Sequence, residues 1–539
     1  MDPEEEAQLE VAAAPTGVFA GTEGKDFRVL AAGTAQNIIG LGVFVIGTFA
    51  ANILIARSFG GGETGAAALG IVTLGTQFAF IAAAGTRMGM DMASVRYVSI
   101  EVGAGRPGAV RVVVARAVLI ALAVSVAFGA LTVALATPIG NLLAPGGSDP
   151  SQTIGSIRAA GVAIPFIALT YVWLGGGRGL KVMRHTLYVQ WVAQPLLWIV
   201  LMVAFWQVDK TEPMSVWAYA ASWVLAAAGG WFFWTRLSRK FAKEPPEAGL
   251  TAALIKYGGP RAPAALLSQG LFWIDYFVAS AVGSPAVTSN DLGVYAACVR
   301  VALAMVLFLT AVSYVFSPFV ADLHARGETE KLDTLFKSIT RWTVAGTIPL
   351  LLLMLLAPAA ILRLFGGSDF TSGTTALRIL VIGQAINVSV GAAGFVLIMA
   401  GRTGWDLTVY GVSALLDLVL SLILVPKFGI NGAAASQAIT IGLSNWLRLA
   451  LVKKYVGIFP WDKPYARLAF PAAACAIAML AAQAILPGRK WLLELIGIGL
   501  AGAIVYVPVL LRFGLTEGER VALRNGIAKV RGRSAAASG

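Results

Sequence analysis

The stretch DLTVYGVSALLDLVLSLILVPKFGINGAAASQAITIGLSNWLRLALV, residues 406–452, contains the pattern that decides the fold. Two apolar runs, 406–425 and 430–452, flank the segment VPKFG. A helix needs about 20 mainly apolar residues to cross the hydrocarbon core of a bilayer. Because Pro and Gly interrupt the two runs, the stretch predicts two separate membrane-spanning helices.

Runs of the same kind recur along the whole chain of 539 residues, which is 58% hydrophobic and 13% charged. The charged fraction is about half of that in a typical soluble domain. We therefore expect an all-α polytopic membrane protein with about 14 transmembrane helices. They are expected near 30–56, 66–90, 113–138, 157–176, 186–207, 214–235, 261–282, 292–317, 342–364, 376–400, 406–425, 430–452, 465–486 and 491–512.

The connections between these runs alternate in basic charge. One set holds roughly three times as many Lys and Arg residues as the other set. It consists of 87–116, 178–184, 236–261, 326–341, Arg402 and 453–467. Basic loops stay in the cytoplasm, so the sequence predicts a multi-pass protein of the bacterial cytoplasmic membrane with both termini in the cytoplasm. The net charge of +13 then reflects membrane topology and contact with membrane lipids, not binding to nucleic acid.

Two short segments indicate an internal repeat. NILIARSFG (52–60) closes the first expected helix and DYFVASAVG (275–283) closes the seventh, each with a polar residue eight positions before a terminal Gly. An even number of crossings separates them, so the two halves would have the same orientation in the membrane. The segment RLSRKFAKEPPEAG (236–249) is the expected linker between the halves.

Several of these segments resemble one known family. ARSFG, GETGAAALG, RMGMDMASVRYVS and WIDYFVASAVG are similar to segments of the polysaccharide biosynthesis proteins, and so is the long stretch LRILVIGQAINVSVGAAGFVLIMAGRTGWDLTVYGVSALLDLVLSLILVPKFGINGAAASQAI (377–439). These proteins are oligosaccharide flippases of the multidrug/oligosaccharidyl-lipid/polysaccharide exporter superfamily. The resemblance covers about residues 28–460. It implies two pseudo-symmetric six-helix lobes around a central cavity, with two additional C-terminal helices.

The resemblance also implies a function and a domain organisation. The function is transport of a polyprenyl-diphosphate-linked oligosaccharide from the cytoplasmic to the outer leaflet, with a polysaccharide polymerase or glycosyltransferases as partners. The expected parts are a disordered tail (1–27), an N-lobe (28–236), a cytoplasmic linker (237–257), a C-lobe (258–455), two additional helices (456–513) and a basic cytoplasmic tail (514–539).

Asp275 and Arg300 are the leading candidates for functional residues. Each lies roughly 10 Å from the outer end of its expected helix, at a rise of 1.5 Å per residue. A charge facing lipid is costly, so both should face protein or water. One interpretation is an ion pair that locks the helical hairpin. In the other, Arg300 binds diphosphate, which suits the planar guanidinium, while Asp275 orients Arg300 or titrates during transport.

Further polar residues in the expected helices extend this list. Asn52 is equivalent to Asp275 in the repeat, and Asp417 is a second candidate for ion coupling, with Arg448 as its possible partner. Interhelical hydrogen bonding would explain polar residues of this kind equally well. The remaining candidates are Arg57, Arg378, Gln384 and Asn387 for the substrate, and Arg87, Asp91 and Arg96 for cytoplasmic entry.

Other classes of function have little support in the sequence. There is no Walker A motif, and the two His and two Cys residues form no recognisable catalytic or metal-binding pattern, so we expect neither an enzyme nor a cofactor or metal. The alternative function is a cation-coupled antiporter of drugs or small molecules from the same superfamily. Trp273 and Tyr276, which flank Asp275, are compatible with an aromatic and acidic drug pocket.

Overall fold

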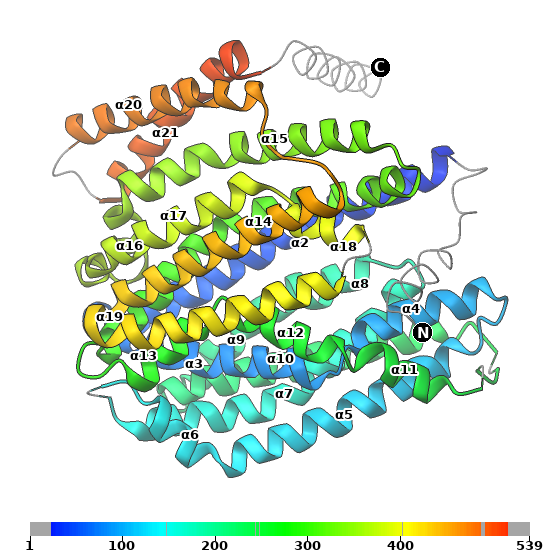
Figure 1. The fold of residues 1–539 in the computed structure, drawn as a ribbon. Coiled ribbons are helices and arrows are strands. Elements are labelled where there is room, and N and C mark those ends of the chain that lie inside the picture. The colour runs from blue at the N-terminus through cyan, green and yellow to red at the C-terminus, as the bar shows by residue number, and fades with distance from the viewer. Residues whose placement is uncertain are drawn as a thin grey trace, which may run out of the picture.

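The computed structural model describes residues 23–146, 148–242, 244–246, 248–400, 403–486 and 491–515. The regular elements within these residues are helices (Figure 1). The first half of the chain comprises α2 (Glu23–Ser58), α3 (Gly62–Thr86), α4 (Met90–Gly103), α5 (Val110–Ala134), α6 (Ala136–Leu143), α7 (Pro150–Gly179), α8 (Arg184–Thr186), the π-helix η1 (Leu187–Ala193), α9 (Gln194–Phe205) and α10 (Glu212–Ser238).

The second half begins with a helix in three pieces. These are α11 (Leu250–Gly258), α12 (Arg261–Gly270) and α13 (Ile274–Val282). They are followed by α14 (Ser289–Ala325), α15 (Thr329–Leu356), α16 (Pro358–Gly366), the 3-10 helix η2 (Ser368–Gly373), α17 (Thr374–Val390), α18 (Ala393–Met399), α19 (Thr403–Tyr455), η3 (Lys463–Leu468), α20 (Ala469–Ile485), α21 (Trp491–Val509) and η4 (Leu510–Gly514).

Twelve of the described helices are long and apolar enough to cross a membrane, and the bent pair 250–270 and 274–282 raises this number to thirteen. The helix α19 adds one more crossing, because its 53 residues would extend about 80 Å if they were straight. Gly429 breaks it with a left-handed φ of 56°, a conformation that Gly adopts readily. The two halves of α19 then run antiparallel (Figure 1), joined by Ser436 on Asp417 and Arg448 on Asp406. With these halves counted separately, the described residues contain fourteen candidate crossings, in agreement with the sequence prediction.

The helices form the two lobes that the sequence predicts, α2–α10 and α13–α19. Between the lobes, α3 packs tightly against α14, because both helices carry small residues at the crossing. A Cβ atom at Gly293 of α14 would lie 1.6 Å from the carbonyl oxygen of Ala66 of α3. The Tyr276 hydroxyl also donates to the Gly70 carbonyl oxygen (2.7 Å). The lobes therefore touch directly where α3 and α14 begin.

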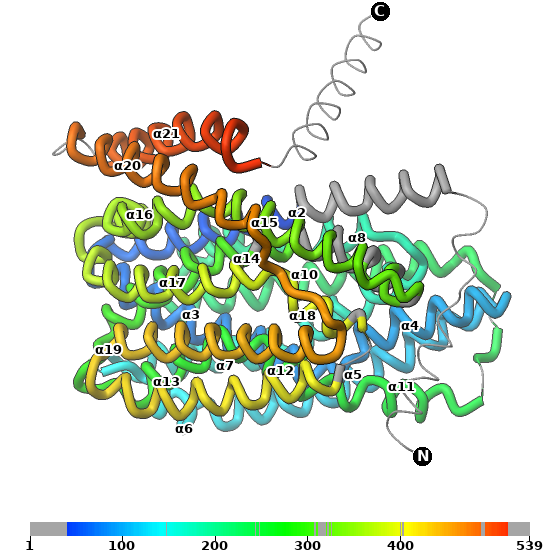
Figure 2. The backbone as a smooth tube through the Cα atoms, turned by 45° about the horizontal axis from the view of Figure 1, so that its top comes forward, coloured from blue at the N-terminus to red at the C-terminus, as the bar shows by residue number. Residues whose placement is uncertain are grey.

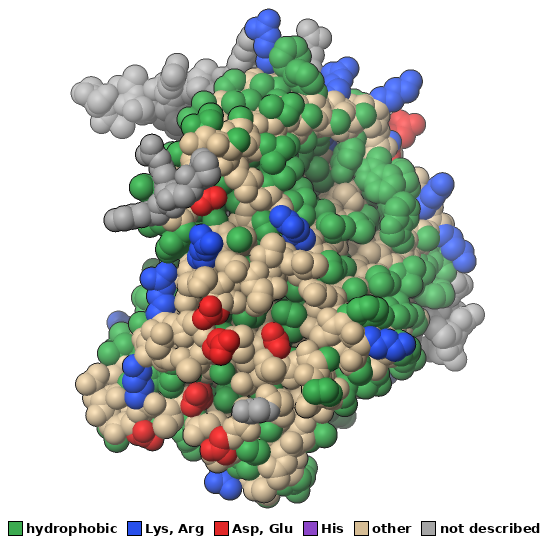
Figure 3. Space-filling model, turned by 90° about the vertical axis from the view of Figure 1, so that its left-hand side faces the viewer, with side chains coloured by type: hydrophobic (Ala, Val, Ile, Leu, Met, Phe, Trp, Pro, Cys, Tyr) green, Lys and Arg blue, Asp and Glu red, His purple; other side chains and the backbone are tan. Residues whose placement is uncertain are grey.

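Two ends of the molecule can be distinguished by their loops. The loops with many Lys and Arg residues, near α4, α8 and α11, lie together at one end, which we call the basic-loop end (Figure 1). The other end bears α6, α13 and the turn of α19. Figure 3 shows this second end, where Asp and Glu side chains gather near the middle of the face.

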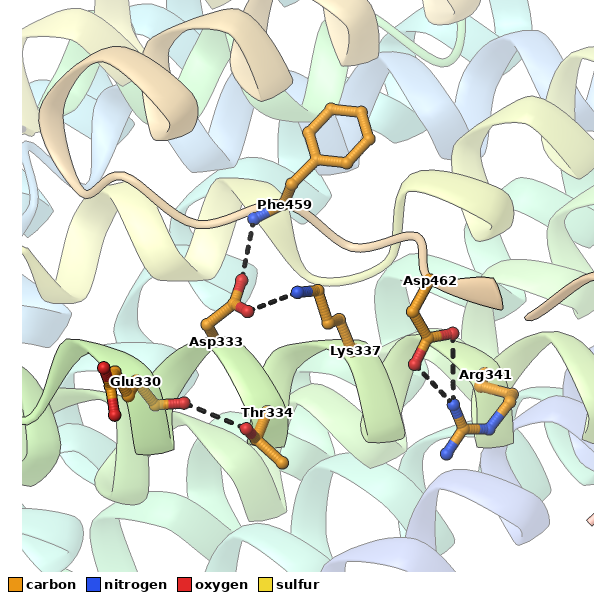
Figure 4. A network of polar contacts seen from close by, with 7 residues as sticks. All are labelled: Glu330, Asp333, Thr334, Lys337, Arg341, Phe459 and Asp462. Carbon is orange, nitrogen blue, oxygen red and sulfur yellow. Dashed lines mark hydrogen bonds and ion pairs between the residues drawn. The ribbon is translucent and has the colours of Figure 1, made fainter. Parts of the chain in front are cut away.

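The C-terminal helices α20 and α21 pack beside the C-lobe, next to α15 (Figure 2). The segment 456–462, which we call the strap, connects α19 to them. Figure 4 shows how polar contacts hold the strap on α15: Asp333 accepts from the Phe459 backbone N–H (3.1 Å), and Arg341 Nη1 donates to Asp462 (2.9 Å). Trp461 adds a hydrogen bond to the Ser389 carbonyl oxygen of α17 (2.8 Å).

Three features of the fold were not predicted from the sequence. The loop 87–116 contains the helix α4, and the expected linker 237–257 contains most of α11, which packs against α4. The seventh span, expected to be continuous over 261–282, bends by 66° between Gly270 and Ile274. Its first part packs on α3 of the N-lobe and its last part on α19 of the C-lobe, so this span connects the two lobes.

Candidate functional site

Arg300 lies between the lobes. It belongs to α14, and its Nη1 donates to Thr73 Oγ1 of α3 (3.0 Å) and to the Ala296 carbonyl oxygen (3.4 Å). Its guanidinium stacks over the Trp273 ring at 5.4 Å from the centroid, and the residue is only 7% exposed. No carboxylate among the described residues pairs with it. Arg300 is thus a buried cation held by a hydroxyl, a carbonyl and an aromatic face, so its charge is not neutralised by the protein.

Asp275 has partners of its own, so of the two interpretations the ion pair between Asp275 and Arg300 is wrong. The Tyr295 hydroxyl donates to one carboxylate oxygen of Asp275, and Gln437 Nε2 donates to the other (3.4 Å). Gln437 also donates to the Phe272 carbonyl oxygen (3.0 Å), which fixes the amide across the bend in the seventh span. Asp275 faces the interior of the C-lobe, where Tyr295 and Gln437 bind it. Arg300 faces the N-lobe, where it donates to Thr73.

Asp417 lies close to Asp275, near enough for a direct electrostatic interaction between the two carboxyl groups. Ser436 Oγ donates to Asp417 Oδ1 (2.7 Å), and Ser421 Oγ donates to Ser436 (2.9 Å). Both Asp residues have no exposed surface. Arg448, considered as a partner of Asp417, pairs instead with Asp406, through its Nε and Asp406 Oδ1 (3.4 Å).

The structure therefore brings two of the predicted residues, Asp275 and Asp417, into one buried polar cluster within the C-lobe. Sequence reasoning missed the residues that complete the cluster: Tyr295, Ser421, Ser436 and Gln437. A usable signal was present for Ser421, which lies four residues after Asp417 and hence on the same helix face.

The other predicted substrate residues lie apart from this cluster. Asn52 is buried, and its Nδ2 donates to the Thr48 carbonyl oxygen (2.6 Å). Arg57 and Arg378 are exposed and bind the carbonyl oxygens of Leu364 (3.0 Å) and Leu355 (3.0 Å), respectively.

Two of the predicted substrate residues, Gln384 and Asn387, form a polar stripe on α17. Asn387 Nδ2 donates to Gln384 Oε1 (3.1 Å), and Gln384 itself has no exposed surface. Arg378, which precedes them on the same helix, points elsewhere, to the α15 carbonyl oxygen of Leu355. The stripe thus consists of the two amide side chains alone.

The three predicted entry residues lie near the basic-loop end, on α4 and just before it. Arg87 Nε is 3.5 Å from Asp91 Oδ2, and its guanidinium lies over the Tyr171 ring (4.4 Å). Arg96 lies over the Tyr257 ring (4.8 Å), with Arg261 over the same ring at 5.0 Å.

Tyr257 belongs to α11, so the contact with Arg96 joins α4 to the start of the seventh span. Arg261 Nη1 also donates to the Tyr257 hydroxyl (2.7 Å), which orients the ring for this contact. A group of arginines on aromatic supports thus lies where the two lobes meet at the basic-loop end. The aromatic faces hold the three guanidinium groups in place.

Comparison with known proteins identifies the family. The model of the MatE family matches residues 38–203 and 215–423. The chain belongs to the MatE family. The match covers the N-lobe and the C-lobe as far as the first half of α19, so the second half of α19, α20 and α21 lie outside it. The resemblance to the exporter superfamily seen in the sequence is thereby confirmed.

Individual MatE relatives and structures support this assignment. The chain is 26% identical over 174 residues to the probable low-salt glycan biosynthesis flippase Agl15 of Haloferax volcanii (32% of this chain, 36% of that protein). It is 27% identical over 244 residues to the probable flippase AglR of the same organism (44% of this chain, 50% of that protein). The chain therefore spans half or less of the length of these curated relatives.

Solved structures share the fold. The lipid II flippase MurJ in an inward closed conformation aligns with a TM-score of 0.66 at 15% identity, covering 89% of this chain and 98% of that chain. A multidrug resistance MATE family transporter of the MOP superfamily, in its inward-facing conformation, aligns with a TM-score of 0.60 at 14% identity, covering 77% and 98%. A lipid II flippase and a multidrug transporter thus both share the fold of this chain.

Proposed function

We propose that this protein moves a polyprenyl-diphosphate-linked oligosaccharide across the cytoplasmic membrane by alternating access, for the synthesis of surface polysaccharide. The basic-loop end is assigned to the cytoplasm, with both termini on that side. The observation that carries the proposal is Arg300, a buried guanidinium between the lobes without a carboxylate partner among the described residues. An anionic ligand would neutralise this charge, and a diphosphate offers the oxygens that a guanidinium binds best.

The remaining candidate residues have defined roles in this proposal. Arg87, Asp91 and Arg96 would receive the diphosphate at the cytoplasmic end, before it reaches Arg300. Asp275 and Asp417 would bind the coupling ion, in a part of the C-lobe that the anionic lipid does not contact. Asn387 would bind sugar hydroxyls, and Gln384, which has no exposed surface, would hold its amide in place. Because a ligand shifts a conformational equilibrium only through different affinities for the two states, Arg300 must bind the diphosphate more strongly in one state than in the other.

The alternative function is a cation-coupled drug antiporter. The buried carboxylates and the aromatic rings of Trp273 and Tyr276 favour it, as does the fold shared with a MATE transporter. However, the Trp273 ring is covered by the Arg300 guanidinium and the Asp275 carboxylate by Tyr295 and Gln437. A cationic drug would have to displace a resident cation to reach that ring, so this alternative is the weaker one.

The test compares Arg300 variants in proteoliposomes that contain a fluorescent polyprenyl-diphosphate-linked oligosaccharide. Arg300→Ala should lower the flipping rate by about tenfold or more, since a hydrogen bond to a charged group contributes about 1.5–3 kcal/mol. Arg300→Lys should retain part of the rate, because it keeps the charge. The control is Arg158→Ala, which removes an exposed arginine of α7 that is not among the candidate residues. A normal flipping rate in Arg300→Ala, or transport of a cationic dye instead of the lipid, would contradict the proposal.

A further inference from the structure

The two halves of α19 carry polar residues on facing sides. In the first half, 403–428, the polar positions recur every three or four residues, which places them on one helix face. They are Asp406, Tyr410, Ser413, Asp417 and Ser421. In the second half, 430–455, the same spacing joins Gln437, Thr440, Ser444 and Arg448, with Ser436 adjacent. We call these ten residues the polar seam.

The seam lies inside the C-lobe. Nine of its members are buried, and Tyr410 is partly buried. The two halves are joined at both ends of the seam, by Ser436 on Asp417 and by Arg448 on Asp406. The opposite faces of both helices bear exposed apolar side chains, including Leu415, Leu422 and Ile439. The hairpin therefore presents its apolar side outward and encloses its polar side, although polar groups in a membrane interior are costly.

The seam has the length of a path from one membrane surface to the middle. Asp406 and Asp417 are separated by eleven residues, or about 16 Å along the helix. The same separation and distance apply to Arg448 and Gln437. This is about half of the hydrocarbon thickness of about 30 Å. Asp406 and Arg448 lie toward the basic-loop end, whereas Asp417 and Gln437 meet Asp275 at the inner end of the seam.

Several buried polar atoms along this line lack a protein partner. They are Asp417 Oδ2, Thr440 Oγ1 and Arg448 Nη2 in the seam, and Gln384 Nε2 on the adjacent α17. Buried polar groups in proteins are nearly always hydrogen-bonded to protein or to ordered water. Packing alone would not explain this arrangement, since hydroxyls that only strengthen helix packing find a partner within the protein, as Ser421 does on Ser436. Water supplies the natural partners for the unpaired atoms.

We propose that the polar seam is a proton path from the basic-loop end of the C-lobe to the carboxyl pair Asp417 and Asp275. This inference rests on the proposed transport function and specifies its coupling ion and the side of entry. A proton from water at the Asp406–Arg448 end passes along water and the hydroxyls of Ser413, Ser444 and Thr440. It then forms an O–H bond at Asp417 Oδ2 and neutralises that carboxylate, and release follows the same steps in reverse.

The charged and titratable groups around the path fit this role. Asp275 of α13 and Tyr295 of α14 face the inner end, and Asp406, Tyr410 and Arg448 of α19 line the entrance. Arg448 is neutralised by Asp406 and lies over the Tyr410 ring (4.6 Å), so the entrance carries no net charge that would repel a proton. Two neighbouring carboxylates in a buried site favour sharing a proton, because both are costly to keep charged together.

The experiment follows proton exchange directly, by infrared difference spectroscopy of the protein reconstituted in lipid. A change from H₂O to D₂O shifts the carbonyl band of a protonated carboxyl group, and Asp417→Asn identifies the band of Asp417. Thr440→Val should slow deuteration of this band by about tenfold, since it leaves a gap in the hydrogen-bonded path. Thr440→Ser, which keeps the hydroxyl, should exchange at the rate of the parent protein. The control Thr132→Val changes a buried threonine of α5 in the other lobe.

Two results would overturn the proposal. One is an unchanged exchange rate in Thr440→Val, which would mean that the seam is not the route. The other is the absence of any carboxyl band assigned to Asp417 between about pH 4 and about pH 9, a range that covers normal and strongly raised carboxyl pKa values. Neither result depends on the transported lipid. A failure of the flipping assay with normal proton exchange would therefore overturn the proposed substrate and leave the proton path intact.

Discussion

The crossing of α3 and α14 provides a prediction about the conformational equilibrium. Gly293→Ala would place a methyl group 1.6 Å from the carbonyl oxygen of Ala66, a backbone atom that cannot rotate away. Overpacking of this kind costs about 1–3 kcal/mol. If the lobes separate here during transport, the cost applies only to the state in which they touch. The ratio of separated to touching states should then rise by about 5- to 150-fold, the range that 1–3 kcal/mol gives.

Spin labels at the exposed positions Glu63→Cys and Ala286→Cys would report the separation of the lobes by double electron–electron resonance. The two native cysteines, Cys298 and Cys475, are buried and can remain in place. Gly293→Ala should shift the distance distribution toward longer distances. The control Gly404→Ala, at a helical glycine with open space around its Cβ position, should not. An unchanged distribution together with an unchanged melting temperature would refute the view that this crossing closes the space between the lobes.

Three further predictions concern single contacts. Tyr295→Phe removes the hydroxyl that donates to Asp275, and should destabilise the protein by about 1.5–3 kcal/mol if that carboxylate is charged, so an unchanged melting temperature would argue for a neutral Asp275. A double-mutant cycle of Arg341→Ala and Asp462→Ala should give a coupling energy of about 0.5–3 kcal/mol, and strictly additive effects would show that the strap is not held by this pair. The Ser151 side chain and backbone N–H hold the pKa of Asp149 below its ordinary value, so its cap on α7 should be complete above the ordinary pKa and lost as the pH falls through the lowered one. Amide exchange at Ser151, divided by the rate of an unstructured peptide at the same pH, should then rise toward one, whereas an exchange rate at neutral pH equal to that of Asp149→Ala would contradict the cap.

The sequence predicted the parts of the fold that depend on the bilayer. Apolar runs of fixed length gave all fourteen crossings, because the hydrocarbon core imposes a length on each helix. The bend in the seventh span could not be predicted from the residues around it. The segment LFWIDYF (271–277) contains no Pro, and a single Gly, Gly270, directly before it is a weak signal for a bend. The first part of this span packs on both α3 and α19 and the last part mainly on α19, so the bend accompanies tertiary contacts that the sequence does not reveal.

The candidate site was predicted in part. The sequence placed Asp275 and Arg300 at the same depth, but depth does not determine which helix face each residue occupies relative to its neighbours. In the orientation that α14 adopts, Arg300 donates to Thr73 of α3, whereas Tyr295 of the same helix donates to Asp275. Similarly, Arg448 was considered as a partner of Asp417, whereas the antiparallel hairpin of α19 brings it level with Asp406. By contrast, the helical spacing of the polar seam was visible in the sequence.

The central claim is that Arg300 binds the diphosphate of a lipid-linked oligosaccharide between the lobes. The most direct measurement is a structure of the protein with a bound polyprenyl diphosphate. We expect phosphate oxygens at about 2.7–2.9 Å from the Arg300 guanidinium nitrogens, as in charge-assisted hydrogen bonds. A diphosphate bound elsewhere, with Arg300 still on Thr73 and Trp273, would contradict the account.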